Sequence, residues 1–496
     1  MTIPDPVLPP RVLVMGASGY VGTNLVPCLA ARGMAVRAAA RRRAALESRG
    51  WTGVEVVAAD ALDPASLDRA LAGIDIAYYL VHSMAAGADF PRIDREAAVR
   101  FRDAAARAGV KRIVYLGGLQ PAQRASAHLA SRGETGDLLR EGLVPVTELR
   151  AGMIIGPGSA AFEVIRDLVF HLPGMVTPRW VRSRSQPIAL ADVLEYLARL
   201  PLLPDAAGRI YDAGGPEVLT YEELMRQFGA LVGRHPVIVP VPVLTPQLSS
   251  YWLGLVTSVP TNVARALIEG LEHDVLADDA PIRSLIPLEL TTYRAAAAAA
   301  LADRRPENAT GRWTEGSMLY RQNRPDFAFY AKRLQGEAVA AAPVDAAWRE
   351  VVAIGGERGY YFLDAAWKAR ACVDQIVGGT GLRRGRRDPD DLVVGDTVDF
   401  WRVVALEPGR RLTLLAEMRM PGSAALDFEL TPRDDGHTKI VVTAYFHPAG
   451  APGLLYWYAL TPAHLVLFHG LAHAIATRAE AAESAARVAA GAGHSS

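Results

Sequence analysis

The sequence predicts an α/β fold, a doubly wound parallel sheet, followed by an α+β domain. The chain has 496 residues, which is too many for one compact core and favours two or three domains. Its first 150 residues alternate short apolar runs with amphipathic segments, the pattern of a parallel sheet with connecting helices. Beyond about residue 396, apolar and polar residues alternate between turns, which is typical of an antiparallel sheet.

The apolar runs of the first part are continuous, as expected for strands that helices cover on both faces. We expect strands at residues 11–16, 35–40, 54–59, 74–81, 112–117, 144–150 and 209–212. Amphipathic spacing predicts helices at residues 20–32, 64–72, 94–108, 133–141, 160–171 and 221–231 and from Ala191 onward. The alanine run 295–300 is expected to end a helix, and the prolines within 236–246 exclude a regular helix there.

The last third of the chain predicts a helix, then a sheet, then a long helix. Residues 344–355 have helical spacing, and turns at Glu407-Pro408-Gly409 and Asp434-Asp435-Gly436 divide an antiparallel meander. A helix is expected from Pro462 to about Ala489. This order would suit a curved sheet that grips the last helix around an apolar cavity.

Composition makes nucleic acid a poor candidate partner. Lys+Arg and Asp+Glu are 53 each, so no basic excess is available to neutralise nucleic-acid phosphates. Cys28 and Cys372 lie far apart in sequence, and the first residues do not match a signal peptide, so we expect a reduced, cytoplasmic protein. His469 and His473 share a helical face near His464, but no acid lies close, so no metal site is predicted.

A membrane contact stays open at residues 453–476. No Asp, Glu, Lys or Arg occurs from Ile440 to Thr477, and the run is long enough to cross a bilayer. Pro462 and three histidines interrupt it, and a buried helix would have the same periodicity. We therefore expect a buried helix, with a membrane span or a peripheral membrane contact as the alternatives.

A glycine-rich loop after the first strand carries the strongest functional signal. Three glycines there suit a tight turn, close approach of a pyrophosphate to the backbone, and close packing of the following helix on the strand. Because strand, loop and helix fall in the required order, the sequence predicts a Rossmann-type dinucleotide site, with contacts from Gly16, Ser18, Gly19, Tyr20, Val21 and Gly22.

The ends of the second and third strands indicate which dinucleotide binds. A site for the ribose 2′-hydroxyl would place an acid after the second strand, whereas this chain has Arg41-Arg42-Arg43. A guanidinium at Arg41 can pair with the 2′-phosphate, so we expect NADP, with NAD not excluded. Asp60 is placed to accept from the adenine amino group, although it could instead cap a helix, for which Asp63 is the better candidate.

These motifs resemble the atypical short-chain dehydrogenase/reductases with NmrA-like or complex-I-accessory-like Rossmann domains. The resemblance rests on GASGYVG, VRAAAR, AAD and YYLVHSM, extends through 146–168 and 256–275, and covers about residues 10–303. It implies that residues 150–303 cover the substrate and that Asp60, Ala61, Leu80, His82 and Ser83 contact the cofactor. Residues 400–430 are similar to helix-grip, SRPBCC-type proteins, so a linker is expected at 304–325 and a ligand-binding domain at 326–489.

The resemblance also exposes a departure at the catalytic positions. Active members of that superfamily carry a Ser after the fifth strand and Tyr-x-x-x-Lys, but this chain has Gly117-Gly118 there, and His128 and Arg132 at the Tyr and Lys positions. His128 could exchange a proton and Arg132 could hold the ribose. A cofactor pocket without chemistry is an equal alternative, and Ser126 is a weaker candidate for the missing hydroxyl.

Two functions follow as expectations. The first is an NAD(P)H-dependent oxidoreductase for a small apolar carbonyl, enone or quinone-like compound. The second is a regulatory or assembly protein that binds NADP(H) without turnover. Retention of the phosphate loop favours the first, and loss of the Ser/Tyr/Lys set favours the second.

Overall fold

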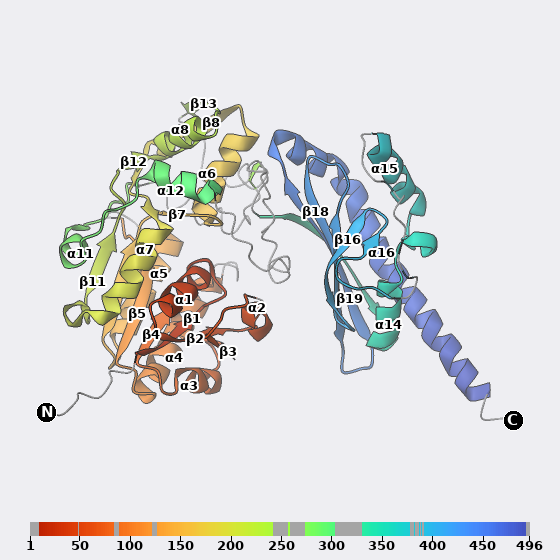
Figure 1. Cartoon of the computed structure of the whole chain (residues 1–496), viewed down its shortest axis with the longest axis horizontal. Helices are drawn as coiled ribbons and strands as arrows, with labels where there is room; N and C mark the ends of the chain where they lie inside the picture. The colour runs from red at the N-terminus through yellow and green to blue at the C-terminus, as the bar shows by residue number, and fades with distance from the viewer. Residues whose placement is uncertain are drawn as a thin grey trace. The chain divides into compact units, whose positions relative to one another are not determined.

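The chain divides into two compact units, residues 1–311 and residues 312–496, called here the N-terminal and C-terminal units. The computed structural model describes residues 9–47, 49–83, 89–121, 126–241, 256–257, 273–302, 330–376, 381, 386, 388 and 391–492. The expected linker at 304–325, and most of the 256–275 stretch, lie outside these residues. Figure 1 shows both units with their elements labelled.

The N-terminal unit is built on a seven-stranded parallel sheet of order β11-β6-β5-β4-β1-β2-β3. Between β1 and β4 the chain changes the direction in which it adds strands, and open parallel sheets bind ligands at such a switch point, at the carboxyl ends of the strands. The strands are β1 Arg11–Met15, β2 Ala35–Ala40, β3 Glu55–Ala58, β4 Ile76–Tyr79, β5 Arg112–Gly118, β6 Val146–Ala151 and β11 Ile210–Ala213.

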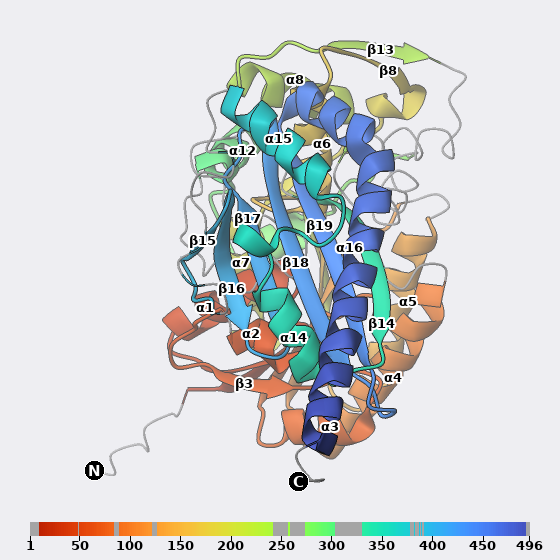
Figure 2. The same cartoon turned by 90° about the vertical axis from the view of Figure 1, so that its right-hand side faces the viewer.

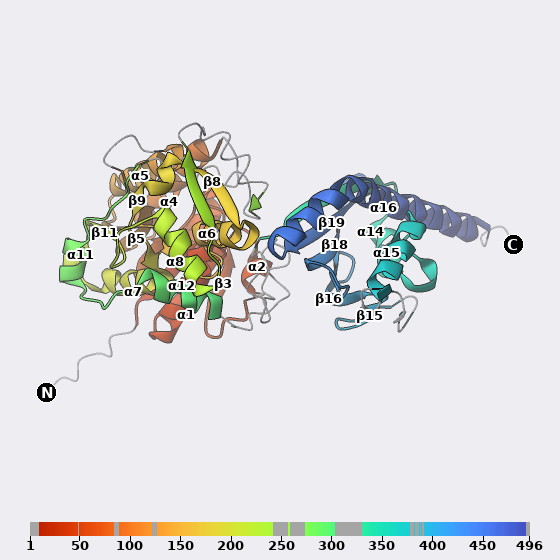
Figure 3. The same cartoon turned by 90° about the horizontal axis from the view of Figure 1, so that it is seen from above.

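Helices cover both faces of this sheet, which confirms the doubly wound prediction. One face packs against α1 and α7 around Val12 and Val14, and the other packs against α3 and α4 around Leu13 and Met15. Figure 3 views these layers from above, with α4 and α5 on one side of the strands and α1 and α7 on the other. The helices are α1 Tyr20–Ala31, α2 Arg43–Glu47, α3 Pro64–Leu71, α4 Phe90–Arg107, α5 Ala127–Arg140 and α7 Leu190–Arg199.

Shorter elements follow β6 in the N-terminal unit. The predicted helices at 160–171 and 221–231 are confirmed, and a capping box between Thr220 and Glu223 starts the second. The alanine run 295–300 lies in the last part of α12, whose last described residue is Ala302. These elements are β7 Ile154–Ile155, α6 Ala160–His171, β8 Gly174–Pro178, η2 Arg179–Arg182, β9 Arg184–Ser185, β10 Ile188–Ala189, η3 Leu200–Leu202, η4 Pro204–Ala206, β12 Leu219–Thr220, α8 Tyr221–Leu231, β13 Val237–Val241, α11 Ala280–Leu285 and α12 Tyr293–Ala302.

The C-terminal unit is a six-stranded antiparallel sheet of order β14-β19-β18-β17-β16-β15 with helices on one face. Leu471, Ile475 and Ala479 of α16 are fully buried in the core that this helix shares with the sheet, and Figure 2 shows α14, α15 and α16 in front of the strands. The elements are β14 Lys332–Ala340, α14 Val344–Val352, η6 Gly356–Arg358, α15 Asp364–Ile376, β15 Thr397–Val398, β16 Trp401–Glu407, β17 Arg411–Ala416, β18 Gly422–Pro432, β19 Thr438–Pro448 and α16 Gly450–Ala492.

The prediction that the last helix begins at Pro462 is wrong, because α16 begins at Gly450 and contains Pro462. A proline inside a helix removes one N–H donor, which is tolerated where water can reach the freed carbonyl. Pro462 is exposed, and the Thr461 hydroxyl donates to the Trp457 carbonyl one turn back at 2.8 Å. Within the described chain, α16 is the one helix long and apolar enough to cross a membrane by length and composition.

Candidate functional site

The glycine loop between β1 and α1 has the backbone that a pyrophosphate requires. Gly16 has φ +92°, and a Cβ there would lie 2.8 Å from the Leu80 carbonyl oxygen. A Cβ on Gly22 would collide with the Gly16 carbonyl, so α1 packs directly on the loop. Gly19 is the N-cap of α1, and the first turn carries neither a capping side chain nor an acid. The positive end of the helix dipole is therefore left to an anionic ligand.

The other loop residues connect this site to later segments. Gly19 is exposed, whereas Ser18, Tyr20 and Val21 are half-buried. A Cβ on Gly156 would lie 2.5 Å from the Tyr20 hydroxyl oxygen, so Tyr20 reaches the segment that follows β6. That segment is the one expected to cover the substrate.

The arginines after β2 differ in their surroundings. Arg41 is exposed and has no ion pair among the described residues, whereas the Arg43 Nε lies 2.7 Å from the Glu47 carboxylate. Asp60 follows β3, where its Oδ1 accepts from the Leu62 amide at 2.9 Å. The alternative cap prediction is confirmed, because Asp63 caps α3 through the Ala65 amide. Arg41 is thus the arginine of the three that combines exposure with an unengaged guanidinium.

His82 and His128 meet at the carboxyl edge of β4 and β5. Nε2 of His82 lies 3.1 Å from Nδ1 of His128, and Nδ1 of His82 lies 2.9 Å from the Asp94 carboxylate. Asp94, on α4, is 4% exposed and also accepts from the Ser83 amide at 2.8 Å and the Ser131 hydroxyl at 3.3 Å. The three side chains form one continuous chain of hydrogen bonds from a buried carboxylate to His128.

Burial and neighbouring charges set the protonation of this chain. Burial, together with the nearby Arg132 and His82, lowers the pKa of His128 to about 3. Burial also lowers the pKa of His82. Burial alone would raise the pKa of Asp94, but hydrogen bonds from His82 and Ser83 outweigh it and lower that pKa. At neutral pH the three hydrogen-bonded side chains are therefore an Asp94 carboxylate and two neutral imidazoles.

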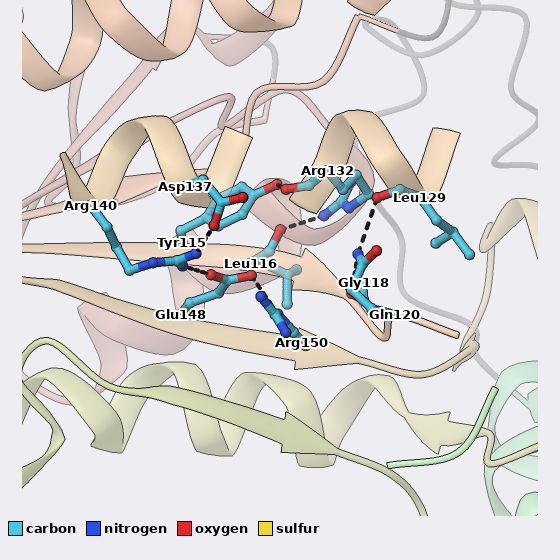
Figure 4. Close-up of polar contacts among 10 residues, drawn as sticks. All are labelled: Tyr115, Leu116, Gly118, Gln120, Leu129, Arg132, Asp137, Arg140, Glu148 and Arg150. Carbon is cyan, nitrogen blue, oxygen red and sulfur yellow. Dashed lines mark hydrogen bonds and ion pairs between the residues drawn. The ribbon is translucent and has the colours of Figure 1, made fainter. Parts of the chain in front are cut away.

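A buried carboxylate occupies the space beside Gly117, where the Ser of related reductases is expected. A Cβ on Gly117 would lie 2.8 Å from Oε1 of Glu148, and a Cβ on Gly136 would lie 2.6 Å from its Oε2. Glu148 is 1% exposed and is paired with Arg140 and with Arg150, whose Nε lies 2.8 Å away (Figure 4). The two glycines leave room for this ion pair, and a serine at 117 would displace it.

Arg132 lies next to this cluster, as Figure 4 shows, and its guanidinium donates to the Leu116 carbonyl at the end of β5. The Tyr115 hydroxyl donates to the Arg132 carbonyl at 2.9 Å. Ser126 is the N-cap of α5 and accepts from the Leu129 amide, which gives its hydroxyl a structural role. Arg132 is consequently held beside His128, one turn further along the same helix.

Sequence reasoning singled out His82 and His128 separately and missed Asp94, which joins them. The signal was present, because Asp94 stands in the buried stripe of α4 with Ala97, Ala98 and Phe101. A carboxylate at an apolar position of an amphipathic helix is rarely buried without partners. Glu148 in the strand VTELRA carried the same signal. No cluster of metal-ligating side chains occurs in the described part of the chain, His469 and His473 included.

Comparison with known proteins places two families on the chain. Residues 16–144 match the family described as NAD(P)H-binding, and residues 328–471 match a family described as a protein of unknown function, DUF2867. The chain is 30% identical over 271 residues to the (4-alkanoyl-5-oxo-2,5-dihydrofuran-3-yl)methyl phosphate reductase of Streptomyces griseus. This alignment covers 53% of this chain and 86% of that enzyme.

Solved structures with lower identity are also similar. The NADPH-dependent quinone oxidoreductase of Escherichia coli, complexed with NADPH, is 19% identical and covers 58% of this chain and 98% of its own, with a TM-score of 0.49. The Citrobacter sp. triphenylmethane reductase complexed with NADP(H) is 19% identical and covers 58% of this chain and 99% of its own, with a TM-score of 0.48.

Proposed function

The chain belongs to the family of NAD(P)H-binding reductases that includes the furanone phosphate reductase of Streptomyces griseus, and from this premise we propose an NADP(H)-dependent oxidoreductase. Its substrate is a small apolar carbonyl, enone or quinone-like compound. The observation that carries the proposal is the open N-terminus of α1, whose glycine loop lies on the strand next to β4 and His82. The name of the relative describes an oxo-dihydrofuran with an alkanoyl group and a methyl phosphate, and the ring and alkanoyl groups support a conjugated carbonyl as the group that is reduced.

Each part of the site has a role in this proposal. The loop residues Gly16 to Gly22 bind the pyrophosphate, Asp60 and Ala61 line the adenine, and Leu80, His82 and Ser83 line the nicotinamide end. When bound, the dihydronicotinamide supplies a hydride to the substrate. His128 exchanges the proton, and Arg132 positions the ribose. The segment from β7 to α12 covers the site. The C-terminal unit is proposed to be a helix-grip, SRPBCC-like domain that binds an apolar ligand.

Arg41 supports NADP as the preferred cofactor. It follows β2, is exposed and has no ion pair among the residues described, so its guanidinium is available to a 2′-phosphate. Arg43 is engaged by Glu47 and serves as a matched control.

The test is a titration of the purified protein with NADPH and NADH, followed by nicotinamide fluorescence. A lost charge-assisted hydrogen bond of about 1.5–3 kcal/mol predicts that Arg41→Ala weakens NADPH binding about 10- to 100-fold and leaves NADH binding unchanged. Arg43→Ala should bind both nucleotides as the wild type does. Equal weakening by the two substitutions would contradict the NADP assignment, and a folded protein that binds neither nucleotide would contradict the dinucleotide site.

One observation favours the alternative, a regulatory or assembly protein that binds NADP(H) without turnover. The Glu148 carboxylate fills the space beside Gly117, so a serine hydroxyl cannot stand there. Oxidation of bound NADPH by any member of a panel of enones and quinones would exclude this alternative. Tight NADPH binding with no oxidation across the panel would favour it.

We also propose that α16 contacts a membrane surface through residues 453–476. Leu455, Val466 and Leu465 are 75%, 58% and 50% exposed, while Leu471 and Ile475 of the same helix are buried against the sheet. Only 28% of the most apolar window of this helix is buried. One packed face and one exposed apolar face suit a helix that lies on a bilayer rather than one that crosses it.

A further inference from the structure

We propose that Asp94, His82 and His128 form a proton relay that protonates the substrate anion at Nε2 of His128. This inference rests on the proposed reductase function and deepens it, because the Tyr and Lys expected in such a site are absent. Two short contacts join the three side chains, from His82 to Asp94 at 2.9 Å and from His82 to His128 at 3.1 Å.

The hydrogen bonds fix the tautomer of both rings. Asp94 as a carboxylate only accepts, so His82 must donate from Nδ1. A neutral His82 then has its lone pair on Nε2, and the contact to His128 requires a donor there, which is Nδ1–H of His128. The lone pair of His128 is left on Nε2, which has no hydrogen-bond partner among the described residues. In this resting state the outer end of the chain is a base.

A proton taken up at Nε2 of His128 does not have to stay on the imidazole. The Nδ1 proton of His128 can pass to Nε2 of His82, and the Nδ1 proton of His82 can pass to Asp94. The result is a neutral carboxylic acid and two neutral rings, with Nε2–H of His128 at the outer end. This loaded state avoids a buried imidazolium next to Arg132, which lowers the pKa of His128.

The proton stored on the three side chains is the one that the reduced substrate requires. Hydride addition to an electron-poor carbon moves an electron pair onto the substrate oxygen, which takes the proton from Nε2 of His128. The proton on Nε2 of His82 then returns to His128, and the proton on Asp94 returns to His82. The substrate gains one hydride and one proton, the nicotinamide loses two electrons, and Asp94 becomes a carboxylate again. Solvent supplies the next proton at Nε2.

Asp94 acts through the two histidines and is therefore a positioning residue that also stores the proton. The Ser83 amide donates to its Oδ1, and the Ser131 hydroxyl donates to its Oδ2, which is the oxygen that faces Nδ1 of His82. Among the described residues, the charged and titratable groups around these side chains are Arg132 on α5, Tyr79 on β4, and Tyr115 on β5, whose hydroxyl donates to the Arg132 carbonyl. The Arg132 guanidinium, together with burial, lowers the pKa of both histidines, so a protonated ring beside it is disfavoured.

The substitution Asp94→Asn separates a relay from a merely structural network. The Asn oxygen must accept from the Ser83 amide, so its NH2 group faces Nδ1 of His82. His82 then has to accept at Nδ1 and donate from Nε2, and His128 in turn carries its proton on Nε2. Both rings are expected to change tautomer although neither has been substituted.

The measurement is NMR of protein labelled with ¹⁵N-histidine, without nucleotide, with His82→Gln and His128→Gln providing the assignments. The wild type at neutral pH should show Nδ1–H on both rings, and Asp94→Asn should show Nε2–H on both. Turnover with NADPH should fall about 100-fold or more in Asp94→Asn, with the dissociation constant for NADPH within twofold of the wild type. Glu134→Gln, the same change at an exposed carboxylate on α5, should retain both properties.

Wild-type rings that carry Nε2–H, or an Asp94→Asn protein that keeps Nδ1–H on both, would overturn the relay. Turnover within threefold of the wild type in Asp94→Asn would do the same. If that variant does not fold, His82→Gln interrupts the chain one step further out and should lose turnover to the same extent. Failure of the wild type to bind NADPH would instead count against the proposed function. The tautomers are measured without nucleotide, so they test the relay whether or not NADPH binds.

Discussion

At the scale of single residues, His128 couples protonation to folding. Its pKa in the folded protein is lowered to about 3, against about 6.5 for an unperturbed histidine. Between these two pH values the unfolded chain binds a proton at this site and the folded chain does not. Protonation therefore favours unfolding, and stability must fall as the pH decreases from 6.5 towards 3.

This linkage gives a prediction for the pH dependence of stability. At pH 5 the difference in pKa corresponds to about 2 kcal/mol of lost stability from His128 alone, to order of magnitude. Replacement of His128 by Gln should remove this pH-dependent loss of stability. The free energies of unfolding of the wild type and of His128→Gln should therefore converge as the pH falls from 7 to 5. Urea titrations at the two pH values measure the difference. Parallel pH curves would show that His128 is protonated as easily in the folded state.

At the scale of elements, α16 has one packed face and one exposed apolar face. Leu471, Ile475 and Ala479 belong to the core shared with the sheet, whereas Leu455, Leu465 and Val466 are exposed. A helix that presents apolar side chains outward without a charge between them can insert that face into the headgroup region of a bilayer. The proposed membrane contact therefore depends on these exposed side chains, and their substitution is expected to leave the fold intact.

Co-sedimentation with phosphatidylcholine vesicles tests this surface. The double substitution Leu465→Glu and Val466→Glu removes about 3–6 kcal/mol of apolar burial in the bilayer and should reduce the bound fraction at least 100-fold. Thr477→Glu adds an acid at an exposed position further along the same helix and should bind as the wild type does. A wild-type protein that does not sediment with vesicles would contradict the membrane contact.

Elements with strong local signals were predictable from the sequence, whereas others depended on distant partners. The helix at 221–231 has a capping box, and α3 has Asp63 as its cap, so both could be located from neighbouring residues alone. Strand β14 pairs with β19 across about a hundred residues of sequence, which no local pattern reports. The start of α16 was misplaced because a proline usually marks a helix boundary, and here its freed carbonyl lies on an exposed face.

The candidate site was predictable in the same uneven way. The glycine loop is contiguous in sequence, and its residues lie as expected at the end of β1. The relay combines residues from the end of β4, from α4 and from α5, and the contact between His82 and His128 spans 46 residues. Topology brings them together, because β4 and β5 are adjacent strands. A single sequence contains each member but not their proximity.

At the scale of the whole molecule, the two units have separate hydrophobic cores. One core runs from Ala338 to Ala479, and the clusters of the N-terminal unit lie between Val12 and Ile286. Because the dinucleotide loop belongs to the N-terminal unit alone, a bound nucleotide stabilises that unit directly.

Differential scanning calorimetry of the full chain tests this independence. We expect two unfolding transitions, of which NADPH shifts one. At a free concentration one hundred times the dissociation constant, the shift should correspond to about 2.7 kcal/mol. Arg41→Ala should reduce the shift of the same transition. A single transition that moves as a whole would show that the two units unfold together.

The order of strands separates the residue proposed to select the coenzyme from the residues proposed to transfer the proton. Arg41 leaves the sheet from β2 and His82 leaves it from β4, with β1 between them. On the proposed assignments, a substitution at Arg41 is expected to change the coenzyme preference and to leave proton transfer unchanged. Gly16 is the exception, because a side chain there would press on the Leu80 carbonyl two residues before His82. A substitution at Gly16 is expected to weaken both cofactor binding and proton transfer. A second substitution at Arg41 would restore neither property.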